Sequence, residues 1–292
     1  MTASPIPQGS VAAALARARA LGLDWLDAQW LLAHVLQKPR TWLLAHDDDL
    51  LAAPAAAAYG QACQRRADGE PLAYITGEHG FHGLLLTITP AVLVPRPDTE
   101  VLVDWALALL PALAAAPRVL DLGTGSGAIA LAVAQGHPAA RVTASDLSPR
   151  ALAVARANAD RLGLALHTCL GHWWQAVAAD ARFDLVLCNP PYIAGADPHL
   201  PALRHEPLLA LTPGGDGLDA LRAVIQGAPP HLAPGAWLLL EHGWDQAEAA
   251  TALLGQAGFV DLATRRDIES RPRCTGGCWW PAGAGCHPDN KP

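Results

Sequence analysis

The stretch Arg118-Val-Leu-Asp121-Leu-Gly123-Thr124-Gly125-Ser126-Gly127, followed by AIALAVAQ (128–135), decides the fold. RVLDL has the pattern of a short buried strand and AIALAVAQ that of a helix, with glycines in the turn between them. Glycine allows a ligand to approach the backbone closely, and the first turn of a helix offers free N–H groups. The stretch therefore predicts a strand–turn–helix unit that binds a ligand at its turn.

The alternation of strands and helices continues after this unit. We expect strands at 141–145 (RVTAS), 164–169 (LALHTC), 183–188 (FDLVLC), 235–241 (GAWLLLE) and 259–264 (FVDLAT), and helices over 148–162, 217–227 and 245–257. This order predicts an α/β fold with a mostly parallel sheet and helices on both of its faces. In such sheets, ligands bind at the carboxyl ends of the strands.

The part of the chain before this sheet has a different pattern. Residues 1–78 predict a small helical bundle, in which Ser10 and Asp24 cap helices that end at Gly22 and Pro39. Trp25, Leu26, Trp30, Leu31 and Val35 recur at helical spacing in the second of these helices. Residues 79–97 predict a hairpin or an extended connector, and residues 98–292 form the second domain, which opens with a helix capped by Asp98 or Thr99.

Composition excludes several classes of protein. The 292 residues are 51% hydrophobic with a mean hydropathy of +0.18, so the chain can form a packed core. A net charge of −7 argues against a dedicated nucleic-acid binder. The N-terminus has no signal-peptide pattern, and no apolar run is long enough for a membrane helix. We therefore expect a cytoplasmic protein with reduced cysteines, among which Cys169 and Cys188 are buried.

Asp146 is the second candidate for ligand binding, because it ends the strand that follows the glycine turn. A carboxylate at this point can accept hydrogen bonds from both ribose hydroxyls, or it can cap the helix that starts near Pro149. Gly123, Gly125 and Ala128, with the acid about 20 residues further on, also satisfy the dinucleotide fingerprint. These residues alone leave the nature of the nucleotide open.

The motif Asn189-Pro190-Pro191-Tyr192, directly after FDLVLC, distinguishes between these ligands. The two prolines stiffen the turn, and Asn189 supplies an amide oxygen. That oxygen and the carbonyl of Pro190 can accept hydrogen bonds from one planar NH₂ group, on which Tyr192 can stack. A clamp of this kind suits an enzyme that aims an amide or amine nitrogen at a methyl donor, and a dehydrogenase does not need it.

With these motifs the sequence resembles the peptide chain release factor N5-glutamine methyltransferases (PrmC/HemK family) over nearly the whole chain. Further segments carry the resemblance: 66–77 (RADGEPLAYITG), 90–100 (PAVLVPRPDTE), 197–200 (DPHL), 204–207 (RHEP), 214–217 (GGDG) and 241–244 (EHGW). The resemblance implies a Rossmann-like methyltransferase domain with an N-terminal helical substrate-recognition domain. It also implies methyl transfer from S-adenosyl-L-methionine to the glutamine of the Gly-Gly-Gln motif in release factors.

The resemblance assigns roles to the motif residues. Gly123, Thr124, Gly125, Ser126, Gly127, Asp146, Trp173 and Asn189 would bind the cofactor. Asn189, Pro190, Pro191 and Tyr192 would bind the glutamine, and Asn189, Pro190 and Tyr192 would act in catalysis. We expect a monomer that acts on release factors without nucleic acid or membrane. The alternative substrates are a ribosomal-protein glutamine and an adenine flipped out of a nucleic acid.

His172 departs from the family pattern, because it stands where an acid is expected before the aromatic residue of the adenine pocket. We expect Trp173 to be this aromatic residue, with Trp174, one position away, as the alternative. Arg96 and Glu100 either border the expected active site or are a connector arginine and a first-turn glutamate favoured by the helix dipole. His242 ends a strand at the edge where ligands bind, but most residues at such a place are structural. Cys274, Cys278, Cys286 and His287 have a loose spacing for zinc, and we expect no metal.

Overall fold

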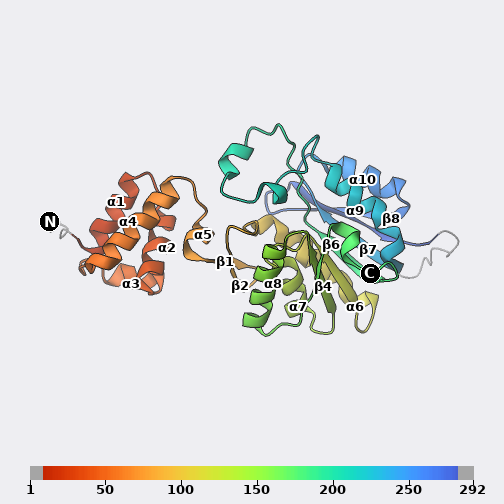
Figure 1. Ribbon diagram of the computed structural model, residues 1–292, viewed down its shortest axis with the longest axis horizontal. Helices are drawn as coiled ribbons and strands as arrows, with labels where there is room; N and C mark the ends of the chain where they lie inside the picture. Colours follow the sequence, from red (N-terminus) through yellow and green to blue (C-terminus); the bar gives the residue numbers. More distant parts are fainter. Residues whose placement is uncertain (1–8, 282–292) are drawn as a thin grey trace. The chain divides into compact units, whose positions relative to one another are not determined.

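A computed structural model describes residues 9–281 (Figure 1). The chain divides into two compact units, Met1–Glu78 and His79–Pro292.

The first unit consists of helices. They are α1 (Val11–Ala20), α2 (Trp25–Leu36), α3 (Arg40–Ala45), α4 (Ala53–Ala67) and α5 (Leu72–Thr76). The Ser10 hydroxyl accepts a hydrogen bond from the Ala13 N–H, and the Asp24 carboxylate accepts one from Leu26, so both predicted caps are confirmed. Helix α2 ends at Leu36 rather than at Pro39, because Gln37 adopts a left-handed backbone conformation with φ 52°.

The apolar residues of α2 lie on two different faces of the helix. Leu31 and Leu32 are fully buried in the core of the unit with Ala28. Trp25 and Trp30, which the helical spacing also marks as apolar-face residues, are 45% and 48% exposed. The spacing predicts the helix, but two of its tryptophans lie on the surface, in cation–π contact with arginine side chains.

A short hairpin begins the second unit. Strands β1 (Glu78–Phe81) and β2 (Leu84–Thr87) pair with each other. The two residues that join them, His82 and Gly83, both have positive φ (46° and 75°). This is the backbone of a tight two-residue hairpin turn.

The second unit contains a seven-stranded sheet with the order β5-β4-β3-β6-β7-β9-β8. Its strands are β3 (Arg118–Leu122), β4 (Arg141–Asp146), β5 (His167–Leu170), β6 (Phe183–Cys188), β7 (Leu232–Glu241), β8 (Phe259–Arg266) and β9 (Pro272–Trp279). The first five strands in this order are parallel, and β9 is antiparallel to both of its neighbours. The predicted α/β fold with a mostly parallel sheet is confirmed.

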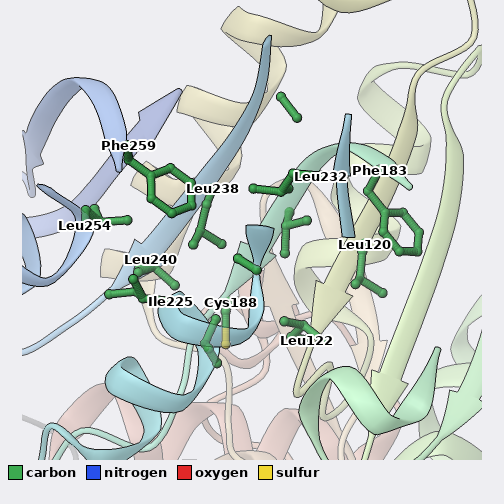
Figure 2. Close-up of a cluster of buried hydrophobic side chains, with 14 of the residues drawn as sticks. Leu120, Leu122, Phe183, Cys188, Ile225, Leu232, Leu238, Leu240, Leu254 and Phe259 are labelled. Atoms are coloured by element: carbon green, nitrogen blue, oxygen red, sulfur yellow. The ribbon is translucent and has the colours of Figure 1, made fainter. Parts of the chain in front are cut away.

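Helices cover both faces of this sheet (Figure 1). They are α6 (Glu100–Leu113), α7 (Ala128–Gly136), α8 (Pro149–Leu162), α9 (Asp219–Gly227) and α10 (Ala247–Gln256). Helices α6, α7 and α8 pack on one face, and α9 and α10 pack on the other. Figure 2 shows the core under α9 and α10, where leucines from β3 and β7 meet Ile225, Leu254 and Phe259. Cys188 is fully buried there, whereas Cys169 on the edge strand β5 is only partly buried, contrary to expectation.

Several strands differ from the sequence prediction. Strand β5 begins at His167, three residues later than expected, and β7 begins at Leu232, three residues earlier than expected. Strand β9 was not predicted, because Gly276 and Gly277 at its centre disfavour a strand. The structure gives the reason for Gly276: a Cβ there would lie 2.5 Å from a methyl of Leu239 and 2.7 Å from the carbonyl oxygen of Leu238.

The register of the central strands places three loop starts at one edge of the sheet. Leu122 of β3 pairs with Ser145 of β4 on one side and with Cys188 of β6 on the other. The chain leaves β3 toward β4 and β5 in one direction and returns to β6 and β7 in the other. This is the topological switch point at which open α/β sheets bind their ligands.

We predict that Gly276→Ala lowers the free energy of unfolding by about 1–3 kcal/mol, because the added methyl overlaps a side chain and the backbone of the neighbouring strand. Urea unfolding followed by circular dichroism measures this change. Gly255→Ala in α10 is the matched control, since its Cβ would lie 3.6 Å from Leu262. It should leave the stability unchanged or raise it by up to about 1 kcal/mol. Equal losses in both variants would contradict the packing argument.

Candidate active site

The glycine turn between β3 and α7 has an unusual backbone. Gly123, Gly125 and Gly127 have φ of 76°, 55° and 84°, values that other residues rarely adopt. A Cβ on Gly127 would lie 3.1 Å from Leu131 and 3.2 Å from Ala155, so this glycine allows close packing against α7 and α8. A Cβ on Gly125 would meet nothing within 4 Å. The turn is therefore packed on its helix side and open at Gly125.

Hydrogen bonds fix the turn to the sheet. The N–H groups of Gly123 and Thr124 both donate to the carbonyl of Ser145, at 2.9 Å each. The Thr124 hydroxyl donates to Asp121 Oδ2 at 2.6 Å. The carbonyl of Ser126 accepts from Asn158 of α8 at 3.0 Å. Each residue of the turn from 123 to 127 thus has a packing or hydrogen-bonding reason for its position.

Asp146 lies beside this turn at the end of β4. Its Oδ2 accepts a hydrogen bond from the Gly125 N–H at 2.9 Å, and its Oδ1 accepts one from the Ser148 N–H at 2.8 Å. The alternative role as the cap of α8 is wrong, because the Ser148 hydroxyl caps that helix by accepting from Ala151. Burial raises the pKa of Asp146, and its hydrogen bonds with Ser148 and Gly125 lower it.

Trp173 and Trp174, the two candidates for the aromatic residue near the glycine turn, have different environments. A Cβ on Gly123 would lie 3.4 Å from the Trp173 ring, so this ring lies against the glycine turn. The Trp174 indole donates to the carbonyl of Val224 at 2.9 Å and stacks on His231 with a centroid distance of 5.0 Å. Trp173 is therefore the aromatic residue at the turn, and Trp174 belongs to the packing under α9.

Asn189 begins the loop after β6, at the same edge of the sheet as the glycine turn. Its Nδ2 donates to the hydroxyl of Thr99 at 3.2 Å. Thr99 is itself buried and ends the 3-10 turn before α6. With Nδ2 bound in this way, the Asn189 oxygen remains as the acceptor that a ligand can use.

Tyr192 is held at both ends. Its hydroxyl donates to Glu241 Oε1 at 3.2 Å, and its carbonyl accepts from Gln246 Nε2 at 3.0 Å. Gln246 also accepts from the N–H of Gly243 at 2.9 Å, so its amide cannot rotate freely. Pro190 is buried and Pro191 is partly buried between these two anchored residues. The motif of 189–192 is therefore a rigid turn.

A hollow of about 260 Å³ opens between Asn189 and Tyr192. Leucine, isoleucine and alanine side chains line most of it, and Arg96 adds a positive charge. The Arg96 guanidinium pairs with the buried carboxylate of Glu206 at 2.5 Å. The hollow is largely apolar, and its polar groups are an amide, a phenol ring and a guanidinium. Such a combination suits a short polar side chain.

Two buried carboxyl groups have strongly raised pKa values. Burial raises the pKa of Asp121 to about 7, although the Thr124 hydroxyl lowers it. Burial also raises the pKa of Glu241 to about 7 against the lowering effects of Thr99, Arg273 and Tyr192. The same burial raises the pKa of the Tyr192 phenol.

Some of these residues could not be identified from the sequence. Thr99 was expected only as a possible helix cap, and nothing in the sequence marked Gln246 or Arg273, which lies in the unpredicted strand β9. Glu100 accepts from the N–H of His82 in the hairpin turn and is not among the residues that line the hollow. The His242 side chain is buried and bonds Thr275 at 2.7 Å, which is a structural role.

The described residues hold no group of three or more metal-ligating side chains. Cys274 and Cys278 are buried in β9, and Cys286 and His287 lie outside the described residues. Within residues 9–281, no helix is long and apolar enough to cross a membrane.

Comparison with known proteins gives relatives for both units. The family model of the PrmC N-terminal domain matches residues 10–77, and that of the methyltransferase small domain matches residues 102–239. A release factor glutamine methyltransferase of Bordetella pertussis is 53% identical over 258 residues, which are 88% of this chain and 95% of the relative. One of Xylella fastidiosa (strain Temecula1) is 48% identical over 94% of this chain and 98% of the relative.

A solved structure supports the fold of the second unit. It is the T. thermophilus 16S rRNA N2 G1207 methyltransferase in complex with AdoMet and guanosine. The two chains are 19% identical with a TM-score of 0.52, over 69% of this chain and 49% of the other. At this identity the likeness shows a shared methyltransferase fold.

We predict that Asp121→Asn becomes more stable relative to wild type as the pH rises from 5 to 8. Between its ordinary pKa of 3.8 and its folded value of about 7, Asp121 keeps a proton in the folded state that the unfolded state has released. This carboxyl group therefore costs stability as the pH rises, and the amide removes the cost. The stability difference should grow by roughly 2–3 kcal/mol over this range.

Urea unfolding at each pH measures the difference. Asp180→Asn, at an exposed aspartate, is the matched control and should show no such trend. A pH-independent difference for Asp121→Asn would show that the buried carboxyl does not titrate in this range.

Proposed function

The chain belongs to the release factor glutamine methyltransferase family, and we propose that it methylates the side-chain amide nitrogen of the glutamine in the Gly-Gly-Gln motif of release factors. The observation that carries the proposal is the orientation of Asn189. Its Nδ2 donates to Thr99, and its oxygen is left as an acceptor beside the hollow. A primary amide has an NH₂ group that such an acceptor can bind.

The turn of 189–192 supplies the remaining parts of an amide clamp. The carbonyl of Pro190 is a second acceptor for the same NH₂ group, and the Tyr192 ring offers a flat face on which the amide can stack. Because Glu241 and Gln246 hold both ends of Tyr192, the clamp keeps its geometry before the substrate arrives. Holding the nitrogen in line with a methyl donor is catalysis by positioning.

The residues at the edge of the sheet fit S-adenosyl-L-methionine. The turn is open at Gly125, the Trp173 ring lies against Gly123, and the Asp146 carboxylate lies beside them. In our proposal, Gly123 through Gly127, Asp146, Trp173 and Asn189 bind this cofactor. When bound, it supplies an electrophilic methyl group on a sulfonium.

The clamp also bears on the low nucleophilicity of the amide nitrogen. An amide nitrogen is a poor nucleophile because its lone pair is delocalised. Two acceptors that bind both N–H groups hold the lone pair along the line of attack and stabilise the positive charge that develops on nitrogen. The nitrogen becomes strongly acidic after methyl transfer, so its proton can leave to water without a strong base in the clamp.

The proposal also covers the oligomeric state, the location in the cell and the class of substrate. The enzyme acts as a monomer on a protein substrate in the cytoplasm, where release factors work. A net charge of −7 opposes the phosphate contacts that dominate nucleic-acid affinity, so adenine is a weaker candidate than glutamine. A ribosomal-protein glutamine would fit the same clamp.

Labelled S-adenosylmethionine tests the substrate directly. We expect the purified protein to transfer label to a release factor, and mass spectrometry to place it on the glutamine of Gly-Gly-Gln. A pool of ribosomal proteins and a duplex oligonucleotide are assayed in parallel. Label on either of these, with none on the release factor, would contradict the proposed substrate.

We predict that Asn189→Ala lowers kcat by at least about 100-fold, because it removes the acceptor that holds the NH₂ group. Cofactor affinity, measured by calorimetry with S-adenosylhomocysteine, should change much less than kcat does. Full turnover by Asn189→Ala would show that the clamp does not act as described.

We further propose that the first unit, residues 1–78, docks the protein substrate through its exposed aromatic surface. Trp25→Ser combined with Trp30→Ser should raise KM for an intact release factor at least about 10-fold, since aromatic residues dominate many interfaces. KM for a short Gly-Gly-Gln peptide should stay within about twofold. Equal changes for both substrates would contradict a docking role.

A further inference from the structure

A buried asparagine in α8 joins the glycine turn to the hairpin of β1 and β2. Asn158 Nδ2 donates to the carbonyl of Ser126 in the turn at 3.0 Å and to the carbonyl of Thr87 at the end of β2 at 3.0 Å. Asn158 Oδ1 accepts from the N–H of Thr87 at 2.7 Å. The residue is fully buried, and α8 lies beside β2 (Figure 1). One side chain thus connects segments that lie 71 and 32 residues before it.

The partners of the Asn158 amide fix its orientation. Both hydrogens of Nδ2 have a carbonyl acceptor, and Oδ1 has an N–H donor. If the amide were reversed, its NH₂ group would oppose the Thr87 N–H and its oxygen would oppose two carbonyls. These buried groups would then lose their hydrogen bonds, which costs free energy. The carbonyl of Ser126 therefore meets a donor in one constant direction.

This hydrogen bond completes the anchoring of the glycine turn around Gly125. The Ser126–Gly127 peptide unit is held at both ends, because the Gly127 N–H donates to the carbonyl of Thr124 at 2.9 Å. On the other side of the peptide unit, the Gly125 N–H donates to Asp146 at 2.9 Å. Glycine moves easily between positive and negative φ, so two glycines alone would leave this turn flexible. Hydrogen bonds must hold it in one conformation.

We propose that Asn158 is a positioning residue for S-adenosyl-L-methionine, which preforms the glycine turn and ties its conformation to that of the hairpin. The inference rests on the proposed role of the turn in binding this cofactor. A turn that is already ordered loses less conformational entropy when its ligand binds, so the affinity is higher. Because the hairpin shares the same asparagine, the cofactor and the hairpin stabilise each other, and this coupling is reciprocal.

Asn158→Leu tests the positioning role, because leucine has nearly the shape of asparagine but no polar group. Calorimetry with S-adenosylhomocysteine should give a Kd at least about 10-fold above that of wild type, since the turn must now be ordered by the ligand. The titrations are made well below the melting temperature of each protein, so that both are folded. A Kd equal to that of wild type would overturn the inference.

Arg161→Met is the matched control on the same helix. The Arg161 guanidinium donates to the carbonyl of Leu85 in the hairpin and, at 3.4 Å, to Asn158 Oδ1. Its loss weakens the contact between α8 and the hairpin but leaves the hydrogen bond to Ser126 in place. The Kd for S-adenosylhomocysteine should therefore stay within about threefold of wild type. An equal rise of the Kd in both variants would indicate a general loss of stability and would overturn the positioning role.

Hydrogen exchange of the wild-type protein, followed by NMR, tests the coupling without any substitution, should the leucine variant not fold. Saturation with S-adenosylhomocysteine should slow exchange of the Thr87 N–H at least about threefold, because Asn158 accepts its hydrogen bond. The Gly258 N–H, which donates to Gly255 at the end of α10, is the control and should not change.

The two ways in which this experiment can fail are distinguishable. Unchanged exchange at Thr87 in a protein that binds S-adenosylhomocysteine would overturn this inference alone. Failure of the wild type to bind S-adenosylhomocysteine at all would overturn the proposed cofactor site and the inference with it.

Discussion

The alignment of three strand ends is the constraint on which the site depends. Parallel strands that pair in register end at the same edge, and Leu122 pairs with both Ser145 and Cys188. The glycine turn, Asp146 and Asn189 follow these strands directly, although 66 residues separate Gly123 from Asn189 in the sequence. The glycine turn and the motif of 189–192 are thus neighbours because of backbone pairing in the sheet.

Most site residues that the sequence predicts belong to local patterns, and the residues that it does not reveal reach the site through long-range contacts. The glycine turn, Asp146 and Asn189–Tyr192 were recognisable because each follows an apolar strand directly. Thr99 and Glu241 could not be found in this way, since they reach Asn189 and Tyr192 from 90 and 49 residues away. Strand β9 was not predicted from the sequence because its central glycines disfavour a strand. Gly276 fits between neighbouring side chains only because it has no Cβ.

Burial of charge is the physical cost of this arrangement. Asp121 and Glu241 are fully buried carboxyl groups, and burial raises the pKa of each to about 7. Amides of similar shape would be more stable in such places at neutral pH. Each carboxyl group accepts a hydrogen bond from a hydroxyl group in a loop of the site: Asp121 from Thr124 in the glycine turn, and Glu241 from Tyr192 in the loop after β6. Above a pH of about 7, each carboxyl group is ionised and can only accept, which gives these loops one hydrogen-bonding pattern.

The backbone conformation at Trp173 fixes another part of the site. Trp173 has φ 48°, a left-handed conformation that costs a bulky residue roughly 1 kcal/mol or more. Contacts of the preceding residues restrict the backbone at Trp173. The Gly171 N–H donates to the carbonyl of Asp146, and a Cβ on Gly171 would lie 2.6 Å from the backbone of Ala176. The strained backbone sets the Trp173 ring against Gly123, while the side chain of His172 is exposed. The position of the aromatic ring therefore depends on the turn at Gly171.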